Sequence, residues 1–100
     1  MNKYVTIYVA GQNNIGVIDI GKITPEDGKK KNTVLITERI EPKLVMALQE
    51  HFDCTVKIRS VEVETAFNWF GHIKLKVYVV IESDGEDYQE EVILEETWLY

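Results

Sequence analysis

Hydrophobic and polar residues alternate along much of the chain, which is the pattern of β-strands that bury one face. Residues 3–10 alternate in this way and are rich in β-branched and aromatic side chains, which favour strands. Residues 17–23 and 33–40 continue the pattern after polar stretches that contain glycine, asparagine or proline. The sequence therefore predicts three strands before residue 41, with turns at 11–16 and 24–28.

The period of the pattern changes after residue 40 and predicts a helix. Leu44, Leu48 and Phe52 fall at i, i+4 and i+8, which places them on one face of a helix. Pro42 suits the first turn of this helix, because a proline there loses no helical hydrogen bond. We therefore expect the only helix of the chain at residues 42–52.

Alternation returns in the second half of the chain and predicts three more strands, at residues 55–64, 72–82 and 87–98. In the first of these the apolar phase shifts at Ser60, and a β-bulge there would account for the shift. We predict an α+β fold in which one helix packs on a mostly antiparallel sheet of about six strands (βββ-α-βββ). A chain of this length fits one domain, which would span residues 1–100.

The last two predicted strands form a hairpin whose register follows from two local signals. Asp84-Gly85 indicates a two-residue turn, because both turn positions need positive φ. Centring the turn there places Lys74 opposite Glu95, and opposite charges across strands stabilise an antiparallel pair. A shift by one residue would move lysines into the apolar row. The predicted pairs are Leu75–Leu94, Val77–Val92, Val79–Glu90 and Ile81–Tyr88 on one face, and Lys74–Glu95, Lys76–Ile93, Tyr78–Glu91 and Val80–Gln89 on the other.

Charge is distributed unevenly along the chain, and this hairpin is its most acidic part. The net charge is −6, and residues 77–100 hold eight acids but no Lys or Arg. Strands of this length exceed the radius of a compact domain, so we expect the acidic end from Glu82 to Glu90, here named the acidic arm, to project from the core. The arm would either bind a partner or be a solvated turn that aids solubility. The residues that would bind a partner are Asp84, Glu86, Asp87, Glu90 and Glu91.

An acidic surface repels nucleic-acid phosphate, so we expect no direct nucleic-acid binding. The expected partner is a larger protein with a basic surface, such as one that normally holds nucleic acid. A second candidate contact is the aromatic loop that contains Phe67, Trp69 and Phe70, which either caps the core or anchors a partner. Together these features predict a small acidic protein-interaction module, of accessory or inhibitor type, without catalysis.

The strands carry apolar or aromatic residues on both faces, so one helix cannot cover the whole sheet. In residues 3–10, for example, Tyr4 and Tyr8 alternate with β-branched residues. The sheet would curl into a sandwich or half-barrel, or a second copy would cover it in a homodimer, the commonest oligomer. The alternative function is therefore a self-assembling structural protein, with Tyr4, Tyr8, Trp69 or Trp98 buried between subunits.

Metal and catalytic chemistry find little support in the sequence. His51 and Cys54 lie close together but have no further ligands at suitable spacing, so we expect a histidine at a helix C-terminus and a small core residue. His72 opens a strand and is expected to pair with Glu96 or Thr97 across the hairpin rather than to act as a base. We expect no cofactor, no metal and no catalysis, and a small enzyme or ligand binder with a pocket near His72 is the least favoured interpretation.

The remaining composition concerns the cellular compartment. A single cysteine excludes an internal disulfide and fits a reducing environment. No stretch approaches the roughly 20 apolar residues of a membrane helix. Residues 3–10 are too short and too polar for the core of a signal peptide. We therefore expect a cytoplasmic protein that does not bind membranes.

Overall fold

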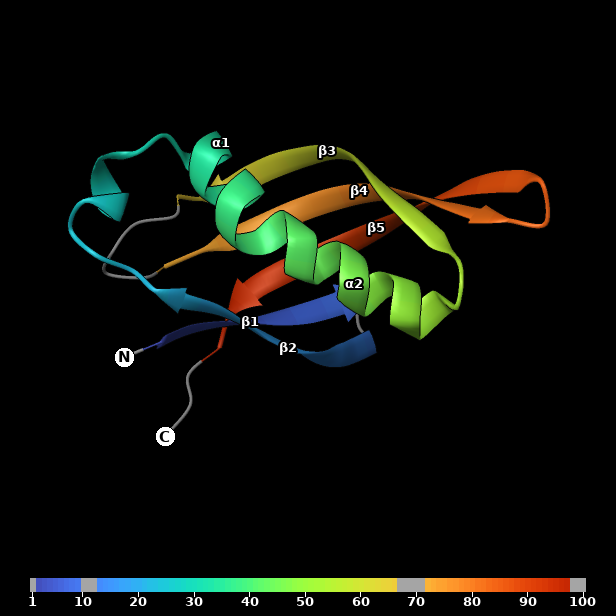
Figure 1. Cartoon of the computed structure of the whole chain (residues 1–100), viewed down its shortest axis with the longest axis horizontal. Helices are drawn as coiled ribbons and strands as arrows, with labels where there is room; N and C mark the ends of the chain where they lie inside the picture. Colours follow the sequence, from blue (N-terminus) through green and yellow to red (C-terminus); the bar gives the residue numbers. More distant parts are fainter. Residues whose placement is uncertain (1, 10–12, 67–71, 98–100) are drawn as a thin grey trace.

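A computed structural model of the chain describes residues 2–9, 13–66 and 72–97. These residues form a helical layer packed on one sheet (Figure 1). The chain is therefore α+β, as its pattern predicts. In chain order the elements are β1 (Asn2–Val9), β2 (Asn13–Lys22), the 3-10 turn η1 (Asp27–Lys29), α1 (Asn32–Leu35), the π-helical turn η2 (Ile36–Ile40), α2 (Glu41–Phe52), β3 (Thr55–Thr65), β4 (Lys74–Ser83) and β5 (Glu86–Glu96).

The sheet has five strands in the order β2-β1-β5-β4-β3, and each neighbouring pair is antiparallel. β2 and β3 are consequently its two edges. β2 starts at Asn13, within the stretch predicted to be a turn. Gly16, with a φ of 146°, and a register shift next to Tyr8 allow these residues to pair with β1.

The strand predicted at residues 33–40 is wrong, because these residues are helical. α1, η2 and α2 follow one another without a break through residues 32–52. Pro42 has no N–H to bond the preceding turn, and the wider π-helical turn directly before α2 accommodates that loss. The sheet therefore has five strands rather than about six. A stripe of buried residues recurs every fourth position through the segment: Ile36, Ile40, Leu44 and Leu48.

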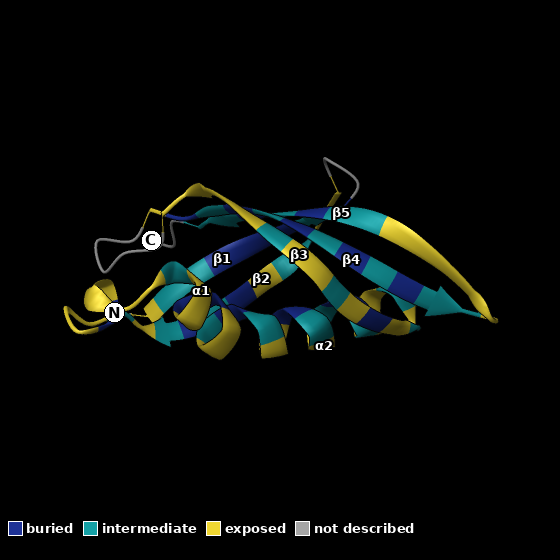
Figure 2. Cartoon of the chain, turned by 90° about the horizontal axis from the view of Figure 1, so that it is seen from above, coloured by how far each residue is buried: buried dark blue, intermediate teal, exposed yellow. Residues whose placement is uncertain are grey.

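The core lies between the helical layer and one face of the sheet (Figure 2). The helix predicted at 42–52 is confirmed as α2, which buries Leu44 and Leu48. Phe52 and Cys54 pack at the margin of the core, so the expected packing of Cys54 is confirmed. The opposite face of the sheet, here named the open face, is covered by no helix of the described residues. The strands bury Val5, Ile7, Val9, Ile18, Ile20, Val56, Leu75, Val77, Val79, Ile81, Val92 and Leu94.

The register predicted for the last hairpin is confirmed pair by pair from Lys74 opposite Glu95 to Ile81 opposite Tyr88. Its turn residues Asp84 and Gly85 have φ values of 50° and 78°, as a two-residue turn of this type requires. The hairpin continues past the end of the helical layer, so the acidic arm projects from the core (Figure 1). The molecule is accordingly elongated, at 44 × 28 × 19 Å.

The edge strand β3 contains the predicted irregularity. Its register with β4 shifts between Ile58 and Ser60, so Arg59 is the extra residue, close to the bulge expected at Ser60. Ile58 and Val63 fall on opposite sides of the bulge and pair with Val79 and Leu75, both of which face the core. The bulge therefore keeps the apolar residues of both halves of β3 on the helix side of the sheet.

Candidate functional site

The predicted partner-binding carboxylates lie at the acidic arm, but they face two directions. Asp84, Glu86 and Asp87 are exposed, whereas Glu90 and Glu91 are half-buried. Glu90 lies opposite the buried Val79 and so points to the helix side, and Glu91 is on the open face. By the same alternation Glu86 shares the helix side and Asp87 the open face. The arm is therefore acidic on both faces.

Lys57 of β3 neutralises the base of the arm. Its Nζ lies 3.0 Å from Oε1 of Glu82, and Glu82 lies opposite Asp87. The hydrogen bond to Glu82 raises the pKa of Lys57, and the charges of Glu82 and Asp87 raise it further. Asp84 and Glu86, nearer the tip, form no ion pair with any residue in the described ranges. The charge at the tip is thus left for solvent or a partner.

Tyr88 lies among these carboxylates, and sequence reasoning did not select it as a site residue. It pairs with the buried Ile81 on the helix side, yet its side chain is 48% exposed. The helical layer ends before it reaches this part of the hairpin (Figure 1). Its place in the apolar row was predicted by the register, but its exposure depends on where α2 ends. Tyrosine combines a large apolar area with a hydroxyl group and is enriched among residues that dominate interfaces.

The aromatic loop lies outside the described residues, so the predicted contacts of Phe67, Trp69 and Phe70 are not placed. The same holds for Trp98. The structure places the two flanks of the loop. β3 ends at Thr65, and Ile73 is buried and accepts a hydrogen bond from the backbone N–H of Glu96.

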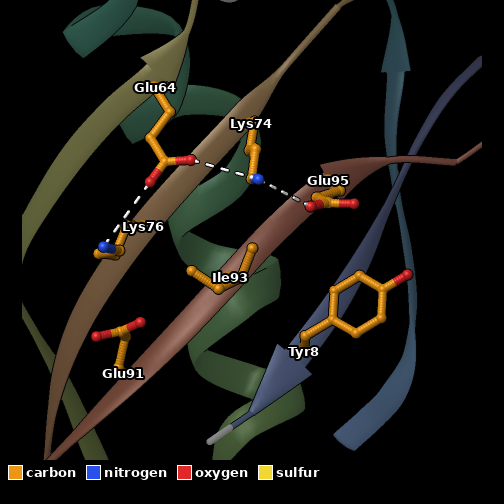
Figure 3. A pocket seen from close by; sticks show the side chains of 7 residues that line it. All are labelled: Tyr8, Glu64, Lys74, Lys76, Glu91, Ile93 and Glu95. Atoms are coloured by element: carbon orange, nitrogen blue, oxygen red, sulfur yellow. Dashed lines mark ion pairs between the residues drawn. The ribbon is translucent and has the colours of Figure 1, made fainter. Parts of the chain in front are cut away.

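A shallow depression of about 570 Å³ lies on the open face (Figure 3). Nζ of Lys74 is 3.3 Å from Oε1 of Glu95 and 3.6 Å from Oε2 of Glu64. Lys76 also pairs with Glu64, at 3.8 Å. The pairing of Lys74 with Glu95 was predicted, but Glu64 was not, because its place depends on a second register shift near the end of β3. The lining residues are Tyr8, Glu64, Lys74, Lys76, Glu91, Ile93 and Glu95.

The charges of this depression largely compensate one another. The hydrogen bond to Glu95 raises the pKa of Lys74, and the charges of Glu95 and Glu64 add to the effect. Tyr8, which the sequence proposed as a dimer contact, and Ile93 are half-buried beside these ion pairs. The open face is therefore a mixed surface rather than an apolar one.

A smaller depression of about 270 Å³ lies at the start of β4, next to His72. Nδ1 of His72 is 3.2 Å from Oε2 of Glu96, which confirms the expected pairing across the hairpin. Glu96 also pairs with Lys3, at the start of β1. The Glu96 carboxylate therefore joins β5 both to β1 and to the segment that leads into β4.

His51 and Cys54 do not form a joint site. The His51 ring packs edge-on against the Phe52 ring, with 4.8 Å between centroids. Within residues 2–9, 13–66 and 72–97, no group of three or more His, Cys, Asp or Glu side chains is arranged to hold a metal ion. The helices of these ranges are too short or too polar to cross a membrane.

No protein-family model, no curated protein and no solved structure matches the chain. The geometry of the acidic arm, of Tyr88 and of the open face is therefore what indicates a function. Among these surfaces, the arm combines uncompensated charge with an exposed aromatic side chain.

Proposed function

We propose that the chain is a small protein-interaction module whose acidic arm binds a basic surface on a larger protein. The observation that carries this proposal is the 48% exposed Tyr88, which stands among carboxylates on a hairpin that extends past the core. An aromatic anchor supplies affinity, and the surrounding charges steer a basic partner and select against acidic ones. A hairpin that served solubility alone would need the charges but not the tyrosine.

The regular pairing of the arm supports the same function. The ladder between β4 and β5 continues without a shift to Ser83 opposite Glu86, directly beside the turn. Lys57 ties the base of the arm to β3 through Glu82. A surface that is ordered before it binds loses little conformational entropy on association. The arm is thus built as a stiff projection rather than as a loose acidic tail.

Self-assembly through the open face is supported less well. Tyr8 and Ile93 offer apolar area there, but ion pairs that involve Lys74 lie beside them. Burying paired charges between two subunits carries a desolvation cost that their attraction does not always offset. This face therefore favours self-assembly less than the arm favours a basic partner.

We also propose that the function is binding rather than catalysis. The imidazole of His72 is held against Glu96, and the same carboxylate pairs with Lys3. A general base needs a proton of the substrate or of a nucleophile within hydrogen-bond reach. The contacts of His72 favour a role in joining strand ends.

The test is affinity capture with the purified chain, followed by measurement of the affinity for each protein captured. A triple variant replaces Glu86, Asp87 and Glu90 with Lys, and a second variant is Tyr88→Ala. We expect a basic protein that binds the wild-type chain and is lost with both variants. We also expect its affinity to fall as salt rises from about 0.1 M to about 1 M, because the charges of the arm are exposed.

A matched control carries the same change of charge elsewhere. Glu26, Glu38 and Glu41 precede or begin α2, at the end of the helical layer that lies away from the arm (Figure 1), and are replaced together by Lys. This control should keep its partner, because it changes the net charge without changing the arm. Retention of the same partners by the arm variants would contradict the proposal.

A further inference from the structure

β3 is an edge of the sheet, and its charged residues are ordered in a way that fits a second copy of the same strand. Lys57 and Arg59 lie in its first half, and Glu62 and Glu64 lie in its second half. When two copies of a strand pair antiparallel, the first half of each lies opposite the second half of the other. We propose that two chains associate through their β3 edges around a twofold axis at Val61, which joins two five-stranded sheets into one.

The bulge in β3 determines the register of this pairing. Arg59 and Ser60 together take the place of one residue in the ladder with β4, so Val56, Ile58, Val61 and Val63 all share the helix side. Paired residues in a sheet point to the same side, which makes Val61 opposite Val61 of the second copy the central pair. The adjoining pairs are Glu62 with Arg59, Val63 with Ile58, and Glu64 with Lys57.

The backbone of β3 has hydrogen-bonding groups available for this pairing. Alternate residues of an antiparallel pair direct their N–H and C=O away from the partner strand. The backbone N–H of Val56 points away from β4, because it donates to the side-chain oxygen of Gln49 in α2, at 3.4 Å. Val56 thus shows which alternate residues of β3 have outward backbone groups. By alternation through the bulge, Ile58, Val61 and Val63 are also outward. The residues that meet across the proposed twofold axis are therefore those with outward backbone groups.

The order of the charges distinguishes self-pairing from simple protection of an edge. Charged side chains on an edge strand usually discourage association, and four charges of one sign would repel a second copy most strongly. Here the two basic residues precede the two acidic ones, so an antiparallel copy places opposite charges together in each of four pairs. Among the described residues, Glu62 forms no ion pair, and the guanidinium of Arg59 donates a hydrogen bond to the side-chain oxygen of Gln89 but has no charged partner. Both would gain a charged partner in the dimer.

An apolar contact accompanies these charges. Val63 is 42% exposed, although it faces the helix side of the sheet. In the proposed register it lies opposite Ile58 of the second copy, which is half-buried in the single chain. Pairing would therefore cover apolar surface at two symmetry-related positions.

The other edge is not suited to the same use. The pairing of β2 with β1 shifts register at two points, and Gly16 and Gly21 have positive φ values. Nζ of Lys43 in α2 also donates to the backbone oxygen of Asp19. Bulges and side chains that occupy the backbone are devices that keep an edge from pairing. The pairing of β3 with β4 also shifts register at two points, but no residue of β3 has a positive φ, so its backbone stays extended past both shifts.

The test uses complementary charge reversal, with mass measured by light scattering and sedimentation over a range of concentrations. One variant carries Glu62→Lys and Glu64→Lys, so all four charges of β3 are positive. The other carries Lys57→Glu and Arg59→Glu, so all four are negative. We expect the wild-type chain to form a dimer, each variant alone to associate about 100-fold more weakly, and an equimolar mixture to recover a heterodimer. Circular dichroism checks that each variant is folded, because Glu64 also pairs with Lys74.

A control and a register test complete the experiment. Replacing Glu86 and Glu90 with Lys changes the charge equally and should leave the dimer intact, so failure of the dimer and failure of the acidic arm are distinguishable. In a Cys54→Ser background, Val61→Cys should form a disulfide between two copies on mild oxidation. In the same background, Ile58→Cys should form no disulfide with a second copy of itself, and should form one when it is mixed with the Val63→Cys variant. A wild-type monomer up to about 1 mM, or a dimer that neither reversal weakens, would overturn the proposal.

Discussion

Arg39 and Asp27 are twelve residues apart in the chain, and Nη2 of Arg39 lies 3.2 Å from each carboxylate oxygen of Asp27. Asp27 is only 4% exposed. Its carboxylate also accepts hydrogen bonds from the backbone N–H and the hydroxyl of Thr24, at 2.8 and 3.0 Å. A buried carboxylate needs such partners to remain charged. The ion pair therefore connects the turn η1, which contains Asp27, to the helical turn η2, which contains Arg39.

Replacing Asp27 with Asn should lower the free energy of unfolding by about 1–3 kcal/mol, because Arg39 and Thr24 lose a charged acceptor. Urea unfolding of the purified chain measures the change. Glu26→Gln is the control, since Glu26 is the exposed neighbour of Asp27 and its substitution should change stability by less than about 0.5 kcal/mol. Equal effects of the two substitutions would contradict the role of the buried pair.

Stability should also depend on the protonation of Asp27. The hydrogen bond from the Thr24 N–H lowers the pKa of Asp27 below 3.8, and Arg39 lowers it further, although burial acts in the opposite direction. A carboxylate whose pKa is lower in the folded state stabilises the fold above its unfolded pKa and loses that contribution as the pH falls through the folded value. As the pH falls below about 4, the wild-type chain should therefore lose stability more steeply than Asp27→Asn. Parallel curves from urea unfolding across this range would show that Asp27 does not carry the effect.

The segment that contains Arg39 shows where the sequence pattern is insufficient. Residues 33–40 are rich in β-branched side chains, and local preference predicts a strand. The structure makes them helical, because Ile36 and Ile40 continue the four-residue spacing of Leu44 and Leu48 and bury with them. Packing against the sheet outweighs the local preference, and Pro42, which is typical of the first turn of a helix, concealed from the sequence pattern that the helical segment begins before α2.

The last hairpin was predictable because two independent local signals agree. Asp84-Gly85 defines the turn, and Lys74 opposite Glu95 defines the register. The exposure of Tyr88 was not predictable, because it depends on where α2 ends relative to the sheet. Positions along a strand follow from alternation, whereas exposure follows from long-range packing. The sequence could therefore locate the acidic arm but not the aromatic side chain within it.

Two glycines with positive φ offer a comparison of strain with crowding. Gly85 has a φ of 78° and open space where a Cβ would lie, so Gly85→Ala should cost about 1 kcal/mol from the backbone alone. Gly21 has a φ of 81°, but its Cβ would lie 3.2 Å from Nη1 of Arg39. Gly21→Ala should therefore destabilise more than Gly85→Ala.

The crowding at Gly21 also predicts coupling to Asp27. A displaced Arg39 side chain would weaken its bond to Asp27. The double variant Gly21→Ala/Asp27→Asn should therefore lose less free energy of unfolding than the sum of the losses of the two single variants. The pair Gly85→Ala and Asp27→Asn, which is far apart, should be additive. Thermal or urea unfolding of the wild-type chain, the three single variants and the two double variants measures both cycles, and additivity in the first would exclude movement of Arg39.

Lys74 is the centre of the ion pairs on the open face, and its replacement tests how much they contribute. Its ammonium lies between Glu64 and Glu95, and the hydrogen bond to Glu95 raises its pKa above 10.5. A lysine whose pKa is raised by folding stabilises the fold at all pH values below its unfolded pKa, and this contribution is lost as the pH rises through the higher folded value. Because Lys74 is partly exposed, salt should screen its ion pairs. Lys74→Gln should therefore lower the urea midpoint slightly at low salt and neutral pH. Near 1 M salt, where the Debye length is about 3 Å, its midpoint should equal that of the wild-type chain.

Lys31→Gln is the control, since Lys31 is exposed and has no ion pair with the described residues. Its midpoint should match the wild type at every salt concentration. A salt-independent loss in Lys74→Gln would assign the effect to packing of the lysine stem instead of to charge.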